Sequence, residues 1–218
     1  MRIRALIPLL LLGSFGCTLD EEVSGLRLLG YYGLKAEDDG CTRTDDMTSF
    51  GHYDVAVAEE FGFPYLVYAH LRNDLAPTGD ESNGRVDSNP VEVTRMRLVF
   101  EGEGWPTLPA PMEIPVTGTL IEPADEHWKL VEAIPAEVAG LLESNFERVG
   151  PLSKELRVRI SFVGRTLDGT TVESNALAFK VFVCNGCFAQ LCGGLGVVQV
   201  CAMAGAQGDG VSCLDDEL

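Results

Sequence analysis

Apolar residues at every second position over two segments are the feature that most constrains this chain. Segment 156–162 reads LRVRISF and segment 177–183 reads LAFKVFV. Because successive side chains of a β-strand point to opposite faces, this pattern predicts two strands that each bury one face. The dipeptide Asp168-Gly169 lies between the segments and is typical of a hairpin turn. The second half of the chain is therefore expected to form antiparallel strands over a core.

Other segments extend this pattern toward the N-terminus. Segment 63–71 is apolar on both alternating faces, which indicates a strand in the middle of a sheet. Pro115 lies in another predicted strand and favours an edge position, because proline cannot donate to the ladder. Only segment 134–146 repeats its apolar residues at helical spacing. The other predicted strands are 26–32, 53–58, 91–101 and 112–121, and the predicted loops are 37–46 and 73–90.

The number and spacing of these segments predict the fold class. About seven or eight strands with turns between them and one short helix indicate an all-β chain. The expected architecture is a two-sheet antiparallel, Ig-like β-sandwich with one short helix and a disulfide-stapled C-terminal tail. The chain has 218 residues, which is enough for one such domain with its own hydrophobic core and a small appendage.

The first residues have the layout of a secretory signal. Arg2 and Arg4 precede an apolar run over 5–12, and small residues follow before Cys17. The run is shorter than the roughly 20 apolar residues that span a bilayer. Segment 14–16, Ser-Phe-Gly, fits the small-x-small rule of ordinary signal peptides. A protein that is secreted or soluble in the periplasm is therefore one of the two expectations.

The other expectation comes from Gly16-Cys17, which resembles the end of a bacterial lipobox. This resemblance implies that residues 1–16 are removed and that Cys17 carries a lipid that anchors the chain in a membrane. Thr18 rather than aspartate follows the cysteine, which by the same resemblance implies sorting to the outer membrane of a two-membrane cell. The chain is therefore expected in the cell envelope, attached through its N-terminal lipid.

The cysteine count agrees with lipidation. The chain has seven cysteines, so a lipid on Cys17 leaves an even number for disulfides in an oxidising compartment. Five of the other six lie in segment 184–218, so at least one of these must bridge to Cys41 if all six are oxidised. The sequence leaves the connectivity open. The disulfide candidates are Cys41, Cys184, Cys187, Cys192, Cys201 and Cys213.

The spacing of Cys184 and Cys187 also occurs in zinc knuckles and redox pairs. A structural zinc site needs four ligands at matched spacing, and no second Cys-x-x-Cys follows. A redox pair of the thioredoxin type needs alternating strands and helices, which the pattern does not predict. A staple for a tail with little core of its own is therefore the favoured role.

Charge limits the partners of the chain. Its 33 acidic and 16 basic residues give a formal net charge of −17, which repels nucleic acid and anionic lipid headgroups. No nucleic-acid partner is therefore expected. Calcium is the one ligand that the acidic loops favour, although their spacing departs from the twelve-residue helix-loop-helix motif. A solvated acidic loop is the alternative, and no other cofactor is expected. The calcium candidates are Asp38, Asp39, Asp45 and Asp46.

The sequence contains no catalytic motif that we recognise. Its three histidines, His52, His70 and His127, lie outside any Gly-x-Ser-x-Gly elbow or His-Glu-x-x-His helix. Each histidine is expected to be structural or to face solvent. The chain is therefore predicted not to be an enzyme.

Taken together, the N-terminus, the strand pattern and the tail resemble those of uncharacterised bacterial envelope lipoproteins with Ig-like domains. The resemblance implies a non-enzymatic, membrane-anchored interaction or scaffold module with a protein or glycan partner. The alternatives are a calcium-dependent adhesin or glycan-binding module, and a secreted enzyme of unrecognised type. The expected organisation is a signal peptide over 1–16, a lipidated anchor and tether over 17–25, a β-sandwich over 26–183 and a Cys/Gly-rich tail over 184–218.

Overall fold

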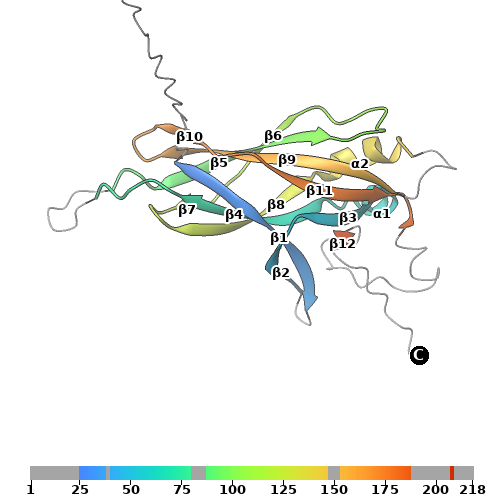
Figure 1. Ribbon diagram of the computed structural model, residues 1–218, viewed down its shortest axis with the longest axis horizontal. Helices are drawn as coiled ribbons and strands as arrows, with labels where there is room; N and C mark the ends of the chain where they lie inside the picture. The colour runs from blue at the N-terminus through green and yellow to red at the C-terminus, as the bar shows by residue number, and fades with distance from the viewer. Residues whose placement is uncertain (1–24, 38–39, 80–86, 147–152, 188–206, 209–218) are drawn as a thin grey trace, which may run out of the picture.

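The computed structural model describes residues 25–37, 40–79, 87–146, 153–187 and 207–208. In these ranges the chain forms two β-sheets and two short helices, so the predicted all-β sandwich is confirmed (Figure 1). A disulfide joins Cys184 to Cys187 where the tail begins. Neither of the two helices in the described ranges has the length and apolar character needed to cross a membrane.

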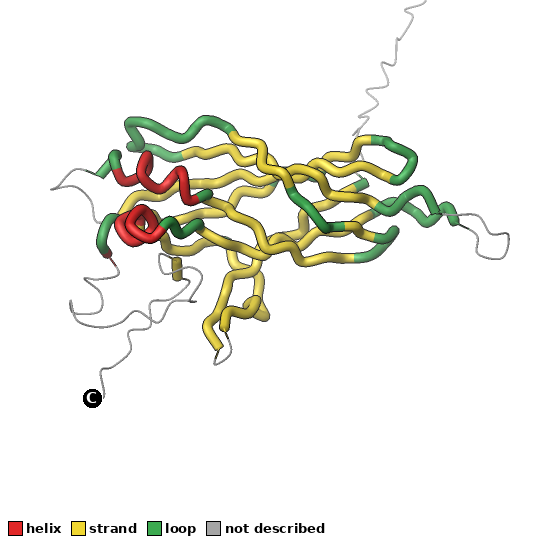
Figure 2. The backbone as a smooth tube through the Cα atoms, turned by 180° about the vertical axis from the view of Figure 1, so that it is seen from behind, coloured by secondary structure: helices red, strands yellow, loops and turns green. Residues whose placement is uncertain are grey.

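The smaller sheet, sheet A, comprises β1 (Leu26–Glu37), β2 (Gly40–Thr48), β4 (Tyr65–Asn73) and β8 (Glu126–Ile134). Its order is β2-β1-β4-β8, and all neighbours are antiparallel. The first half of β1 pairs with β4, and its second half pairs with β2. Figures 1 and 2 show this second half and β2 projecting from the sandwich as a hairpin. The hairpin therefore carries its side chains beyond the body of the sheet.

The larger sheet, sheet B, comprises β3 (Phe50–Asp54), β5 (Val91–Glu101), β6 (Met112–Pro115), β7 (Leu120–Ile121), β9 (Ser153–Thr166), β10 (Thr171–Glu173), β11 (Leu177–Cys184) and β12 (Gln207–Gly208). Its order is β12-β3-β11-β9-β5-β6, with β10 on β9 and β7 on β5. One pair, β3 with β11, is parallel. Pro115 ends the edge strand β6, which confirms its predicted edge position.

The core lies between the inward faces of the two sheets. Strands β9 and β11 bury the apolar members of their alternating patterns, as the sequence predicts. Tyr53, Tyr65, Phe162 and Phe179 are among the largest side chains in the core and are fully buried. Burial of one such side chain contributes about 1.5–3 kcal/mol to folding. Tyr53 also donates its hydroxyl hydrogen to the carbonyl of Phe63 at 2.7 Å, so its buried polar atom is satisfied.

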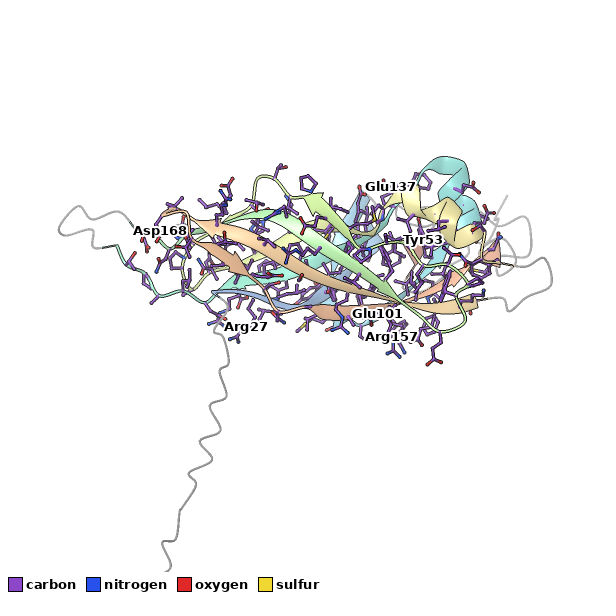
Figure 3. The ribbon with its side chains drawn as sticks, turned by 90° about the horizontal axis from the view of Figure 1, so that it is seen from above. Arg27, Tyr53, Glu101, Glu137, Arg157 and Asp168 are labelled. Carbon is purple, nitrogen blue, oxygen red and sulfur yellow. A yellow bond between two sulfur atoms is a disulfide. The ribbon has the colours of Figure 1, made fainter. Side chains whose placement is uncertain are left out.

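Both helices lie at one end of the sandwich, which we call the helix end (Figure 2). They are α1 (Val55–Phe61) and α2 (Ala136–Glu143). The other end, the turn end, holds the start of β1 and the hairpin turn at 167–170. In Figure 3, Arg27 and Asp168 mark the turn end and Glu137 marks the helix end.

The strand predicted over 53–58 was wrong beyond its first two residues. Strand β3 ends at Asp54, and α1 begins at the next residue. The Asp54 side chain accepts the backbone N–H of Ala56, and Gly62 ends the helix in the left-handed conformation, with φ 68°. These capping residues favour a helical turn over the short alternation that predicted a strand.

Two further expectations were wrong in detail. The acidic segment 37–46 was expected to be a loop, but most of it pairs with β1 as β2. Backbone pairing and the hydrogen bond from the Gly33 N–H to Thr44 Oγ1, at 3.0 Å, stabilise this hairpin despite its charge. The strand expected over 112–121 is split into β6 and β7, because the chain turns between them at Gly118, with φ 68°.

Candidate functional site

Three aromatic rings meet on the outer face of sheet A. Tyr32 of β1, His70 of β4 and Trp128 of β8 come from neighbouring strands, and the register places His70 opposite Trp128. The His70 and Trp128 rings are stacked with their centroids 4.4 Å apart, and Tyr32 meets His70 edge-on at 5.8 Å. Cross-strand neighbours project from the same face of a sheet, so the strand pairing itself builds this stack.

Two residues of the projecting hairpin complete the group. The Arg43 guanidinium lies 4.6 Å from the centroid of the Tyr32 ring and 4.9 Å from that of the Trp128 ring. The Met47 thioether packs on Gly30, where an added Cβ would lie 2.5 Å from the sulfur. A larger residue at position 30 would move the exposed Met47 side chain away from this contact. We call the group the Trp128 patch, which consists of Tyr32, Arg43, Met47, His70 and Trp128.

In the Trp128 patch, one ring is buried and held in place, whereas other side chains are exposed. His70 is 7% exposed, and its Nε2 lies 2.9 Å from Glu126 Oε2. Met47 is 61% exposed and Trp128 is 38% exposed, so large apolar side chains remain in contact with water. This arrangement suits binding by stacking and by ionic contacts, because the rings are already held in place before a ligand arrives.

A second candidate site lies on the outer face of sheet B. It is a hollow of about 520 Å³, which we call the Phe50 groove; it is lined by Ser49, Phe50, Arg157, Ala178, Lys180 and Phe182. Register places Phe50, Lys180 and Arg157 in one row across β3, β11 and β9. The small side chain of Ala178 leaves space beside the longer ones. Phe50 is 45% exposed, so the groove has an open aromatic wall.

Ion pairs cover much of the rest of this face. Glu155 accepts hydrogen bonds from Arg157 Nε at 3.0 Å and pairs with Lys180 Nζ at 3.1 Å. Hydrogen bonds from Lys180 and then from Arg157 hold the pKa of Glu155 below its ordinary value. Arg97, which pairs with Glu113 at 2.7 Å and also with Glu173, lowers the pKa of Glu113 in the same way. The outer face of sheet B is therefore a ladder of compensated charges.

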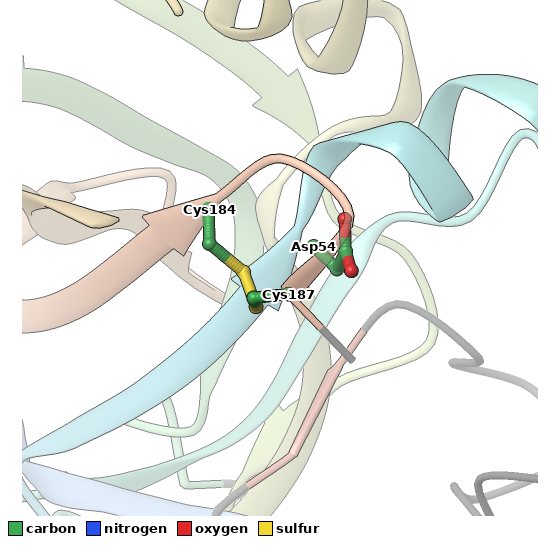
Figure 4. A group of neighbouring side chains, drawn as sticks. All are labelled: Asp54, Cys184 and Cys187. Atoms are coloured by element: carbon green, nitrogen blue, oxygen red, sulfur yellow. A yellow bond between two sulfur atoms is a disulfide. The ribbon is translucent and has the colours of Figure 1, made fainter. Parts of the chain in front are cut away.

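A third cluster joins β3, α1 and the start of the tail (Figure 4). Asp54 is fully buried, and its Oδ1 accepts the N–H of Gly186 at 2.7 Å and that of Ala56 at 3.2 Å. A carboxylate oxygen of Asp54 and the sulfurs of Cys184 and Cys187 lie within 4.8 Å of one another. The two sulfurs are bonded to each other, so the cluster acts as a structural joint.

The predicted cysteines are only partly described. Cys184 pairs with Cys187, so these two need no partner elsewhere in the tail. Cys41 lies on β2 opposite Ala36, and its bridge stays a prediction. Four predicted positions lie outside the described residues: Cys17, Cys192, Cys201 and Cys213.

The calcium candidates are divided in the same way. Asp38 and Asp39 lie outside the described residues. Asp45 and Asp46 lie on the exposed β2, and Asp45 Oδ2 accepts a hydrogen bond from Lys35 Nζ at 3.2 Å. Of the two described candidates, Asp45 therefore already has a cationic partner, and calcium binding stays a prediction.

The sequence reasoning missed the residues of both candidate sites, except that it considered His70 for catalysis. Tyr32, Arg43 and Trp128 lie on three different strands. Each looks ordinary within its own segment, and only the strand order of sheet A brings them together. The sequence offers no signal for Trp128, because its polar neighbours His127 and Lys129 would place it on the opposite, buried face of a strand.

Comparisons with protein-family models, with curated proteins and with solved structures give no match to this chain. A functional proposal therefore rests on the chemistry of its own residues. Aromatic and cationic side chains meet beside an exposed ring in the Trp128 patch and in the Phe50 groove, whereas Lys154 lies over the largely buried Trp105.

Proposed function

We propose that this chain is a non-enzymatic interaction module of the cell envelope, held at a membrane by a lipid on Cys17. In this proposal it docks a protein partner on the Trp128 patch. The observation that carries the proposal is the exposed Trp128 ring, stacked on His70 and contacted by Arg43. Tryptophan, tyrosine and arginine dominate the binding energy of protein interfaces, and methionine is enriched in them.

The chemistry of Arg43 narrows the kind of partner. Among the described residues, its guanidinium contacts two aromatic rings and the Thr44 carbonyl rather than a carboxylate. A guanidinium that lies over aromatic rings still has N–H donors for bidentate binding of a carboxylate. Met47 offers an apolar contact beside it. The expected partner is a protein that places an aspartate or glutamate next to an apolar side chain.

The position of the proposed anchor is compatible with this use of the patch. Gly25, where the described chain begins, leads directly into β1 at the turn end of the sandwich. A short tether from Cys17 would hold the turn end nearest the membrane. The projecting hairpin that carries Arg43 and Met47 would then remain accessible to a partner.

The test is site-specific crosslinking in cells that express the full chain. A photoreactive phenylalanine replaces Trp128 or Met47 in the patch, or Leu167 at the turn end as a matched control. Leu167 is 58% exposed, so it is as accessible as the patch residues. We expect the same protein adduct from positions 128 and 47 and none from position 167. The captured protein is then purified, and Trp128→Ala is expected to weaken its binding about ten-fold or more.

Two results would overturn the proposal. One is an adduct that forms equally from position 167, and the other is an affinity for the purified partner that Trp128→Ala leaves unchanged. The anchor is tested separately by the intact mass of the membrane-fraction protein. If the chain begins at Cys17 and carries no added lipid mass, the module is secreted rather than anchored.

A further inference from the structure

The Phe50 groove, on the opposite sheet, has chemistry that the proposed function does not use. Phe50 and Phe182 form its aromatic side, with their ring centroids 6.3 Å apart at an angle of 70°. Phe182 also stacks on His52, with centroids 5.5 Å apart, so its orientation is fixed. The exposed ring of Phe50 is an apolar surface that water contacts in the free protein.

The two cations of the groove share one ion-pair partner. Arg157 and Lys180 both pair with the single carboxylate of Glu155. The side chain of Arg157 is 58% exposed and that of Lys180 is 40% exposed, so both can reach a ligand. A second carboxylate would complete the pairing of two cations with two anions.

A second hollow beside the Phe50 groove limits where an anionic group of the ligand can lie. It is lined by Glu101, Gly102, Glu103, Glu155 and Arg157, and its three carboxylates disfavour an anion there. An anionic group is therefore directed toward Lys180 and the groove side of Arg157. The uncharged part of the ligand must then lie toward Phe50 and Phe182 on β3 and β11.

The location of the groove favours a saccharide over an extended peptide as its ligand. It lies over β3, β11 and β9, whose backbone groups already pair with one another. An extended peptide laid on this face would find no backbone partners for its own N–H and C=O groups. A saccharide has hydroxyl groups instead, which the side chains of Ser49, Lys180 and Arg157 can bind. The apolar C–H face of its ring suits the exposed Phe50 ring.

We propose that the Phe50 groove binds a saccharide that carries a carboxylate, with its ring against Phe50 and Phe182 and its carboxylate on Arg157 and Lys180. The binding requires no metal ion. It is independent of the Trp128 patch, which lies on the outer face of the other sheet, so failure of either proposal leaves the other intact.

The test is calorimetric titration of the full mature chain with a galacturonate tetramer, a neutral galactose tetramer and a glutamate tetrapeptide, with a chelator present. We expect the galacturonate tetramer to bind about ten-fold or more tightly than either of the others. Phe50→Ala and Arg157→Gln are each expected to weaken binding about ten-fold. Arg95→Gln is the matched control, because Arg95 is 46% exposed against 58% for Arg157 and pairs with Glu113 at 3.1 Å, outside the groove lining. It is expected to change the affinity less than about two-fold.

Three outcomes would overturn the proposal. Binding of the glutamate peptide as tightly as of the galacturonate would show an unspecific anion site. Equal weakening by Arg95→Gln and Arg157→Gln would show general electrostatics over the whole face. Absence of heat and of backbone NMR shifts at millimolar galacturonate would show that the groove does not bind this class of ligand.

Discussion

The outer faces of the two sheets differ in how their side chains are stabilised. On sheet A, His70 stacks on Trp128 and Arg43 lies over two aromatic rings. On sheet B, arginines of β5 and β9 pair with glutamates of neighbouring strands, as Arg159 does with Glu101 at 3.3 Å. Exposed ion pairs contribute little to stability but keep a face soluble. Exposed aromatics have the opposite effect on solubility, so we assign binding to the places where they lie, the Trp128 patch on sheet A and the Phe50 groove on sheet B.

The largest expected difference between the two faces concerns stability. His70→Ala removes a side chain that is 7% exposed, stacked on Trp128 and bonded to Glu126, so we expect a loss of about 2 kcal/mol in the free energy of unfolding. Arg159→Ala removes one exposed ion pair and should cost no more than about 0.5 kcal/mol. Urea unfolding of both variants measures the difference. Equal costs would mean that the two faces contribute to stability in the same way.

A smaller expected effect distinguishes the contact of a cation with a ring from an ion pair. A double-mutant cycle over Arg43 and Trp128 is expected to give a coupling energy of about 0.5–1 kcal/mol that persists in about 1 M salt. The matched cycle over Arg97 and Glu113 should give a smaller coupling energy at low salt, which disappears in about 1 M salt. A coupling on sheet A that disappears in salt would show that it depends on a screened cation–π attraction rather than on packing against the ring.

The sequence predicts the fold better than it predicts either surface. The alternation in segments 156–162 and 177–183 is local, because neighbouring residues decide which face of a strand is buried. The core of β9 and β11 could therefore be predicted residue by residue. Helix α1 was missed although its caps, Asp54 and Gly62, are visible in the sequence. The short alternating stretch predicts a strand, whereas the two capping residues favour the helix that the structure shows.

The surfaces depend on contacts that no local pattern contains. Trp128 meets His70 only because β8 pairs with β4 in a register that places the two residues opposite each other. Phe50 lies beside Lys180 only because β3 joins the edge of β11 in parallel. Strand order and register follow from the whole packing of the sandwich, so composition and motifs cannot predict them.

The smallest expected effect comes from acid titration of the sheet B ladder. Because Arg97 lowers the pKa of Glu113, folding favours the ionised carboxylate. The resulting stability is present above the pKa of the unfolded chain, about 4.3. It is lost as the pH falls through the lower pKa of the folded state. Glu113→Gln removes this contribution. The unfolding midpoint of the variant should therefore fall less than that of the wild type when the pH is lowered from about 5 to about 3.

The partner of Glu113 provides the control for this titration. Arg97→Gln removes the guanidinium that lowers the pKa, so it should flatten the pH dependence as Glu113→Gln does. The double variant should flatten it further than either single variant, because Arg95 still pairs with Glu113 after Arg97→Gln and Arg97 also pairs with Glu173. The side chains are exposed, and about 1 M salt should reduce the difference between wild type and variants. An Arg97→Gln variant with the pH dependence of the wild type would show that Arg97 does not lower the pKa of Glu113. The ladder would then be a set of independent surface charges, and its contrast with the ring contacts of the Trp128 patch would be greater still.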